Sequence, residues 1–257
     1  MRRRGFAAVA AVVVLGMSAV GCGSGHRPAE SEEGGPAATA KAKPAYAELA
    51  DVPARLEKDG TTITVGDPHA KVTVHLYEDP RCPVCKEFET RGGGPKLRAA
   101  TLRREAKTQY TLASFLDGRL NGQGSEKAVN ALRAALEAGK FAEFHETLYA
   151  HQPEESVDGF TDAHLLKLAG RIDGLRGPAF DSAVRSMKYR SFVTAAEKAY
   201  ERAGGPAEPK GPGTPTAEIN DVRIPAESNG VLFDGQIFDM LLAKIRARPE
   251  EWQDASF

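Results

Sequence analysis

The sequence has few cysteines, no long apolar run and no basic tract in its body, and each absence excludes a class of protein. Only three cysteines occur in 257 residues, too few for a miniprotein that depends on several disulfides. The apolar stretch at residues 6–20 is shorter than the roughly 20 residues of a membrane-spanning helix. Basic residues cluster only at residues 2–4 and the net charge is −1, so nothing indicates a nucleic-acid-binding protein.

The first 21 residues have the features of a secretory signal: a positive start, an apolar stretch and small residues before Cys22. The segment resembles the lipoprotein signals of bacteria at Gly21 and Cys22, and departs from them at Ala19, where leucine is usual. We therefore expect residues 1–21 to be a signal peptide. Cys22 would then carry the lipid that anchors the protein to the outer face of the plasma membrane. The alternative is a plain signal peptide cut nearby, which leaves Cys22 as a thiol.

Residues 23–44 contain no aromatic residue and no valine, isoleucine or leucine. They are rich in glycine, alanine, proline, glutamate and lysine. Such a stretch cannot bury enough apolar surface to offset the entropy lost on ordering. We therefore expect residues 22–44 to form a lipid-anchored, disordered linker that precedes a folded domain at residues 45–257.

The hydrophobic patterns of residues 45–257 predict one α/β domain. Strands and helices alternate at first, a long helical block follows, and a hairpin and a helix close the chain. The block predicts a helical insertion at about residues 121–204. The predicted segments are a short helix within 46–58, strands at 61–65, 72–77 and 109–116, a helix near Pro83 that weakens at 92–94, about four helices within 125–203, a hairpin at 216–224 that turns at Asn220 and Asp221, and a helix at 234–245 with Asp234 as its N-cap.

Cys82 and Cys85 follow a predicted strand at the start of a predicted helix, as a dithiol that opens and closes would require. The unpaired N–H groups and positive dipole end of a helix stabilise a thiolate there. Pro83 suits the first helical position because it has no N–H to leave unpaired. Cys85 lies one turn further on, and Arg81 and Lys86 add positive charge. The pattern predicts an exposed nucleophile at Cys82 and a resolving thiol at Cys85.

The two other interpretations of this cysteine pair are a structural zinc site and an inert disulfide. Structural zinc takes four cysteine or histidine ligands, and the sequence offers no second C-x-x-C and no H-x-x-x-H, so we expect no metal site. An inert disulfide across two residues would constrain little chain entropy. A redox-active pair is therefore the favoured interpretation, and no catalytic role goes to the scattered histidines: His26, His69, His75, His145, His151 and His164.

Acidic residues close to the cysteines are the remaining candidates for proton transfer. In the strand at 72–77, Val72, Val74 and Leu76 share one face, and no acid occurs. The first acids are Glu78 and Asp79. Either one moves protons to and from the second cysteine, or both lie in solvent, and the sequence leaves the two interpretations open.

Residues 77–89, which read YEDPRCPVCKEFE, resemble the active-site segment of the DsbA-like thiol–disulfide oxidoreductases of the thioredoxin superfamily. Residues 213–216 resemble the loop before a strand in which that family has a cis proline, and residues 141–150 resemble a helix of its insertion. The likeness spans about residues 61–245. It implies a thioredoxin-like fold of the α/β class with a helical insertion.

The resemblance also implies site residues and partners. Pro215 would be cis and face Cys82, and Thr214 would offer backbone groups to an extended substrate peptide. The activity would be disulfide exchange, outside the cytoplasm, with cysteines of exported proteins. An unidentified redox partner would reset the dithiol, and no cofactor or nucleic acid would take part. We expect a monomer, and the direction, oxidation or reduction, stays open.

A non-enzymatic function is the alternative hypothesis. A thioredoxin-fold lipoprotein could hold a protein partner or a metal such as copper without exchanging disulfides, and a degenerate family member could keep an inert bridge. Covalent adducts trapped by Cys85→Ser would indicate exchange. Tight binding of Cu(I) with no role for either cysteine would indicate the alternative.

Overall fold

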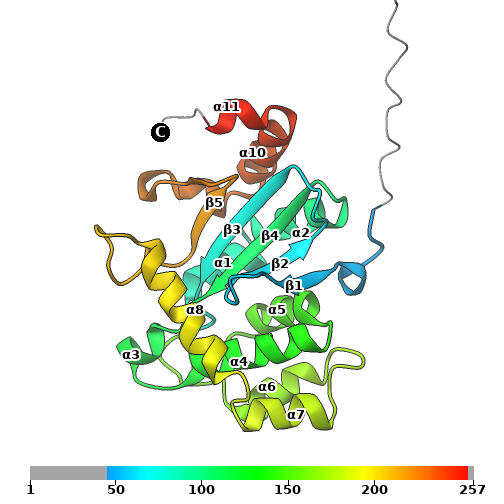
Figure 1. Ribbon diagram of the computed structural model, residues 1–257, viewed down its shortest axis with the longest axis vertical. Coiled ribbons are helices and arrows are strands. Elements are labelled where there is room, and N and C mark those ends of the chain that lie inside the picture. The colour runs from blue at the N-terminus through cyan, green and yellow to red at the C-terminus, as the bar shows by residue number, and fades with distance from the viewer. Residues whose placement is uncertain (1–44, 254–257) are drawn as a thin grey trace, which may run out of the picture. The chain divides into compact units, whose positions relative to one another are not determined.

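The computed structural model describes residues 45–253, so the expected signal peptide, Cys22 and the linker lie outside the described residues. Figure 1 shows the arrangement of the elements. None of the described helices is both long enough and apolar enough to cross a membrane. In chain order the elements are the 3-10 helix η1 (Leu49–Asp51), β1 (Ala54–Leu56), β2 (Ile63–Gly66), β3 (Val72–Glu78), α1 (Pro83–Thr90), α2 (Gly94–Leu102), β4 (Ala106–Leu112), α3 (Leu116–Leu120), α4 (Gly124–Glu137), α5 (Phe141–Ala150), α6 (Asp162–Ala169), α7 (Pro178–Arg185), α8 (Arg190–Ala203), β5 (Thr216–Ile219), β6 (Val222–Arg223), the 3-10 helix η2 (Ala226–Ser228), α9 (Gly230–Phe233), α10 (Gly235–Ala247) and α11 (Pro249–Gln253).

The strands form one mixed sheet in the order β1-β2-β4-β3-β5-β6. The central strands β3 and β4 are parallel, and helices α1 and α2 connect them as a β-α-β crossover. The other neighbouring strands are antiparallel. Helices α3 to α8 all lie between β4 and β5 in the chain. The predicted α/β fold with a helical insertion is confirmed.

Strand β3 leads directly to the cysteines and extends one residue beyond its predicted end. Val72, Val74 and Leu76 are buried on one face, as the alternation predicted. Glu78 has the same parity, so its side chain points to that same face and is 0% exposed. Its register partner in the parallel strand β4 is Leu112. An acid therefore ends this strand inside the core.

Three predicted segments have different bounds in the structure. The strand predicted at 109–116 is Ala106–Leu112, because it stays in register with the seven residues of β3. Residues 46–58 form η1 and then β1, whose pairing with β2 keeps this segment extended. The predicted block of about four helices within 125–203 contains five, α4 to α8. Short loops divide the pattern more often than its apolar residues indicated.

The insertion forms a helical layer around α4, which packs against α5, α7 and α8. In Figure 1, α4 to α7 gather below the sheet, and α8, in yellow, leads back to β5. Helices α10 and α11 lie at the opposite end of the sheet (Figure 1). The insertion touches the thioredoxin-like half through α5, which packs against α1 and η1, through α8, which packs against β4, and through α4, which contacts β1.

The predicted hairpin turn and the predicted helix at 234–245 are both confirmed, but this helix is not the last, because α11 follows it. Asn220 and Asp221 join β5 to β6 with φ of 47° and 67°, as a two-residue turn of type I′ requires. Helix α10 begins after Asp234, whose carboxylate accepts hydrogen bonds from the backbone N–H groups of Gln236 and Ile237 at 2.9 and 3.0 Å. Turn and capping chemistry thus fix both features locally.

Candidate active site

Cys82 and Cys85 lie at the start of α1, at the end of the sheet where β3 terminates. Cys82 is the N-cap, Pro83 is the first helical residue, and both cysteines are free thiols. Cys85 is 0% exposed, as its place one turn into the helix predicted. Cys82 is only 6% exposed, so the prediction of an exposed thiol was wrong, because the neighbouring chain covers it. Val84 between them is exposed.

The two thiols have opposite tendencies to ionise. The hydrogen bond with the Cys85 thiol lowers the pKa of Cys82 to about 6, with help from the backbone N–H groups of Cys85 and Val84, although burial opposes the shift. Burial raises the pKa of Cys85 well above its ordinary value. Near neutral pH, Cys82 is therefore a thiolate and Cys85 a thiol. This asymmetry matches a nucleophile paired with a resolving thiol.

Thr214 and Pro215 lie beside the first cysteine. The Cys82 Sγ lies 3.4 Å from the carbonyl oxygen of Thr214 and donates a hydrogen bond to it when the thiol is protonated. The peptide bond between Thr214 and Pro215 is cis, as the resemblance implied. The structure thus brings the Cys82–Cys85 pair together with Thr214 and Pro215, although Cys82 and Thr214 are 132 positions apart in the chain. The catalytic and substrate-binding roles of these residues stay predictions.

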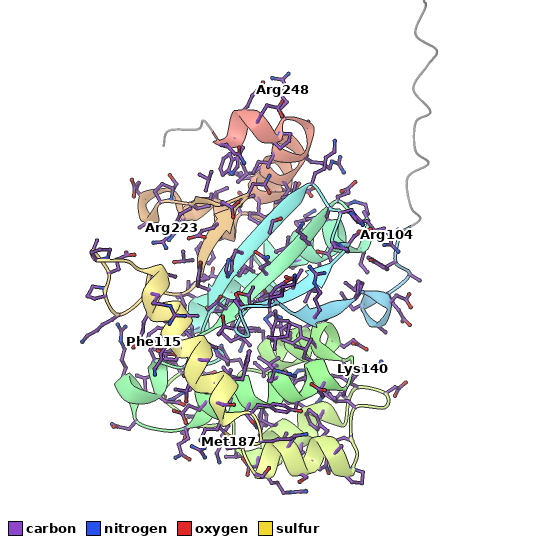
Figure 2. All side chains as sticks on the ribbon, viewed as in Figure 1. Arg104, Phe115, Lys140, Met187, Arg223 and Arg248 are labelled. Atoms are coloured by element: carbon purple, nitrogen blue, oxygen red, sulfur yellow. The ribbon has the colours of Figure 1, made fainter. Side chains whose placement is uncertain are left out.

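The loop before Thr214 is held by Tyr200 of α8. The backbone N–H of Gly213 donates to the Tyr200 hydroxyl at 3.1 Å. The Tyr200 ring stacks on Phe115, with ring centroids 5.2 Å apart, and Figure 2 shows Phe115 beside α8. Gly211 has a φ of 92°, and a Cβ there would lie 2.2 Å from the Tyr200 ring. Only glycine therefore fits at this position without displacing the tyrosine.

Gly211→Ala should lower the free energy of unfolding by about 3 kcal/mol, because backbone strain and a clash with Tyr200 add together. Gly205→Ala is the matched control, since Gly205 also has a positive φ of 64° but no atom within 4 Å of the added Cβ. Backbone strain alone should cost the control about 1 kcal/mol. Urea denaturation of both variants measures the difference. Equal losses would show that Tyr200 does not constrain the loop.

The charges of Arg81 and Lys86 do not act on Cys82 as predicted. Arg81 is buried, and its guanidinium bonds Asp117 at 2.8 Å and the carbonyl oxygen of Glu155 at 3.2 Å. The Lys86 ammonium donates to the carbonyl oxygen of Gln152 at 3.2 Å. Both cations thus face the insertion, because it offers them buried acceptors that the sequence could not reveal.

Asp79 is buried, so the interpretation that it lies in solvent was wrong. Its carboxylate accepts hydrogen bonds from the backbone N–H groups of Arg81 and Leu116 and from the Ser125 hydroxyl, at 2.9, 3.0 and 2.6 Å. Burial raises its pKa to about 7, although these bonds oppose the shift. Asp79 therefore joins the turn before Cys82 to the first residues of α4.

Glu78 belongs to a second buried group, which we call the acid–histidine cluster: Glu78, Glu89 and His145. The Nε2 atom of His145 lies 3.0 Å from the Glu78 carboxylate, and Arg98 donates to Glu89 at 2.7 Å. Burial raises the pKa of Glu78 to about 8 and that of Glu89 to about 7, and lowers that of His145 to about 4. Near neutral pH Glu78 therefore retains its proton, Glu89 is about half ionised beside Arg98, and the imidazole is neutral.

The acid–histidine cluster was missed at the sequence level, where no role went to His145 and none to Glu89. Its ligand atoms lie within 4.8 Å of one another, a spacing that a metal ion could bridge. Arg98, however, already places a positive charge against Glu89. We therefore interpret the cluster as a buried proton store with its own counter-ion, which borders Cys85 on the core face of β3.

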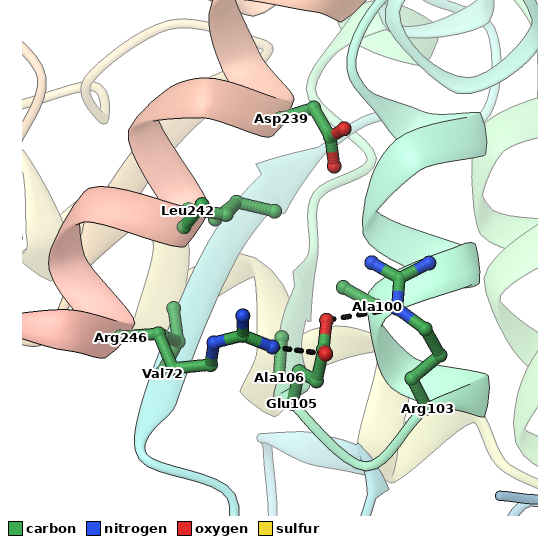
Figure 3. A pocket seen from close by; sticks show the side chains of 9 residues that line it. Val72, Ala100, Arg103, Glu105, Ala106, Asp239, Leu242 and Arg246 are labelled. Atoms are coloured by element: carbon green, nitrogen blue, oxygen red, sulfur yellow. Dashed lines mark hydrogen bonds and ion pairs between the residues drawn. The ribbon is translucent and has the colours of Figure 1, made fainter.

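The cavity in Figure 3, with a volume of about 310 Å³, lies at the opposite end of β3 from the cysteines, beside Val72. Glu105 pairs there with both Arg103 and Arg246 (Figure 3). Because these charges satisfy one another, we assign the cavity no part in the chemistry of the cysteines.

A family model described as thioredoxin matches residues 58–233, more than half of the chain. The chain belongs to the thioredoxin family. The matched residues include both cysteines, the whole insertion and the loop with Thr214 and Pro215. No curated protein matches the chain in sequence.

Solved structures extend this thioredoxin-family assignment. Oxidised BdbD from Bacillus subtilis superposes with a TM-score of 0.60 at 21% identity, covering 80% of this chain and all of its own. MdbA, a thiol-disulfide oxidoreductase from Corynebacterium diphtheriae, gives 0.57 at 17%, covering 75% and 92%. Reduced DsbG, a disulfide bond oxidoreductase from Mycobacterium tuberculosis, gives 0.50 at 25%, covering 77% and 95%. The predicted thioredoxin-like fold with a DsbA-like helical insertion is confirmed.

Proposed function

We propose that this thioredoxin-family protein is an extracytoplasmic thiol–disulfide oxidoreductase that exchanges disulfides with cysteines of exported proteins through Cys82 and Cys85. The observation that carries the proposal is the unequal environment of the two thiols. Cys82 is stabilised as a thiolate at a helix N-terminus, and Cys85 is fully buried and protonated. An inert bridge has no need of this asymmetry.

In the oxidising direction, a substrate thiolate attacks the Cys82 sulfur of the Cys82–Cys85 disulfide. The bond between the two sulfurs breaks, Cys85 leaves as a thiolate and takes up a proton, and Cys82 is joined to the substrate. The second substrate thiolate then attacks the substrate sulfur of this mixed disulfide and releases Cys82 as a thiolate. The substrate loses two electrons and the dithiol gains them, and reduction runs through the same steps in reverse.

Glu78 is the acid that we assign to the proton of Cys85. It is fully buried at the end of β3, and with a pKa of about 8 it holds a proton at neutral pH. Its negative charge, when it is ionised, adds to burial in raising the pKa of Cys85. A proton can therefore pass from Glu78 to Cys85 when the disulfide opens, and return when the disulfide forms.

Location and partners follow from the N-terminal segment and the relatives. The signal-like residues 1–21 and the candidate lipid site Cys22 support export and a position at the outer membrane face. Relatives whose names describe thiol or disulfide exchange support protein cysteines as substrates. A separate redox partner would restore the disulfide after each turnover, and we propose that the protein acts as a monomer.

A peptide with two cysteines tests the proposal directly. The oxidised protein should convert the reduced peptide to its disulfide, and mass spectrometry should show the protein gaining two hydrogens as the peptide loses two. Equilibration with glutathione then fixes the potential, which should lie between about −120 and −270 mV, the range of exchanging dithiols. A potential below about −300 mV with no exchange would mean a structural bridge.

The rate at which iodoacetamide alkylates Cys82 should follow a titration with a midpoint near pH 6, because the rate is proportional to the thiolate fraction of Cys82. Below this pH the rate should fall about tenfold per pH unit, and above pH 7 it should level off. The urea-unfolded protein is the control, and its rate should keep rising to about pH 8.5. A folded-state midpoint near 8.5 would contradict the proposed stabilisation of the thiolate.

A further inference from the structure

Gln152 of the insertion binds the backbone on both sides of Arg81. Its side-chain amide donates to the carbonyl oxygen of Pro80 at 2.7 Å and to that of Cys82 at 2.9 Å. The residue is 6% exposed and lies two positions after the last residue of α5. Both N–H groups of one buried amide thus donate hydrogen bonds to the segment that ends at Cys82.

Gln152 is itself held from two directions. Its backbone N–H donates to Tyr149 of α5, and its carbonyl oxygen accepts from the Lys86 ammonium at 3.2 Å. The Cys82 carbonyl that it binds also accepts from the backbone N–H of Lys86 in the first turn of α1. The amide therefore fixes the peptide group from which α1 starts, and with it the position of the Cys82 side chain.

We propose that Gln152 is a positioning residue that holds the backbone of Cys82 so that its sulfur stays at the N-terminus of α1 and beside Thr214. The inference rests on the proposed function, because a fixed sulfur matters only if Cys82 exchanges disulfides. Without the amide, the chain from Pro80 to Cys82 keeps its turn but loses the two bonds that set the direction of both carbonyl groups. The sulfur then samples positions away from the N–H groups that stabilise its charge.

An amide is the side chain that this position demands. Two carbonyl oxygens face it, so it must donate twice, and it must carry no charge that repels a thiolate. Gln152→Leu keeps the size and removes both donors. Gln152→Glu keeps the shape, replaces the donors by a carboxylate and places a negative charge near Cys82. Both variants therefore remove the two hydrogen bonds at nearly constant side-chain size, and only Gln152→Glu also adds a charge.

The test measures the pKa of Cys82 in the full chain, by the ultraviolet absorbance of the thiolate, and the equilibrium with glutathione. Gln152→Leu should raise the pKa of Cys82 by about one unit, and Gln152→Glu by at least as much. A rise of one unit from about 6 makes the reduced form about fivefold less favourable at pH 7. The glutathione equilibrium should shift by that factor toward the protein disulfide.

Gln123→Leu is the control, because Gln123 is an exposed residue of the same insertion whose side chain makes no capping bond. It should leave both readouts unchanged, and urea denaturation reports the stability of all three variants. If Gln152→Leu does not fold, Gln152→Met decides the question, since its side chain is unbranched, of similar length and uncharged, and lacks both donors.

Two results would overturn the inference: a Cys82 pKa unchanged in folded Gln152→Leu or Gln152→Met, or a shift equally large in Gln123→Leu. The proposed function fails separately. If the unaltered protein neither oxidises a dithiol peptide nor ionises Cys82 near pH 6, the exchange activity itself is wrong. If the unaltered protein does both and the Gln152 variants match it, only the role of Gln152 is wrong.

Discussion

Cys82→Ser should lower the rate of disulfide exchange about a thousandfold or more, whereas Cys85→Ser should accumulate a mixed disulfide between Cys82 and its substrate. Without Cys82 there is no thiolate at the helix N-terminus to attack or to be attacked. Without Cys85 no internal disulfide can form, but the Cys82 thiolate can still attack a substrate disulfide, whose other sulfur leaves as a thiolate. The serine hydroxyl replaces the Cys85 thiol as a hydrogen-bond donor to Cys82. The internal release of substrate by the second thiol is then lost.

Expression of the full chain in an exporting bacterium, followed by acid quenching and non-reducing electrophoresis, measures the trapped species. All variants should carry Cys22→Ser, so that the third thiol cannot form adducts. The adducts of Cys85→Ser should disappear with a reductant and be absent from the Cys82→Ser, Cys85→Ser double variant. If Cys82→Ser formed as many adducts as Cys85→Ser, Cys82 would not be the attacking thiol.

Arg98→Met should destabilise the protein by about 3 kcal/mol, because it leaves the buried Glu89 without its counter-ion. Arg98 donates to the Glu89 carboxylate at 2.7 Å and to the Glu89 backbone carbonyl at 2.9 Å. Glu89 is 3% exposed, so water cannot replace these bonds. The double variant Arg98→Met, Glu89→Gln should recover most of the loss, since a neutral amide needs no counter-ion.

The loss should also depend on pH in a defined direction. Burial already raises the pKa of Glu89 to about 7, and removal of Arg98 raises it further. The unfolded carboxyl ionises near 4.3, so the unfolded state binds fewer protons above that pH and stability falls as the pH rises. Arg98→Met should therefore cost more at pH 8 than at pH 5. Arg103→Met, which breaks an exposed pair with Glu105, is the control and should cost less than about 1 kcal/mol.

Local chemistry explains why the start of α1 was predictable. A strand with strict alternation, a proline suited to the first helical position and two cysteines one turn apart are all close in sequence. The same holds for the turn at Asn220 and Asp221 and for the cap at Asp234. At each place the residues that determine the conformation lie within a few positions of one another, so a short sequence pattern is enough to predict it.

The surroundings of the cysteines were not predictable in this way. The burial of Glu78 could have been predicted, because the alternation of buried residues in β3, continued from Leu76 by two residues, places Glu78 on the core face. It was not predicted, because a charged residue was taken as the end of the apolar strand. His145 and Gln152 lie 60 or more positions beyond the cysteines, and only the packing of α5 against α1 brings them near. Arg81 was assigned to the wrong partner for the same reason, since Asp117 approaches it through tertiary contact.

The residues that hold the active-site loops in place have a consequence for how such proteins can diverge. The segment between β4 and β5 supplies four side chains that form hydrogen bonds with the turn before Cys82 or the loop before Thr214. They are Asp117, Ser125, Gln152 and Tyr200. Substitutions in this segment can retune the redox behaviour while the letters CPVC stay unchanged. Two related proteins with the same two residues between their cysteines can therefore acquire different biological roles. A classification by those two residues alone would group proteins that behave differently.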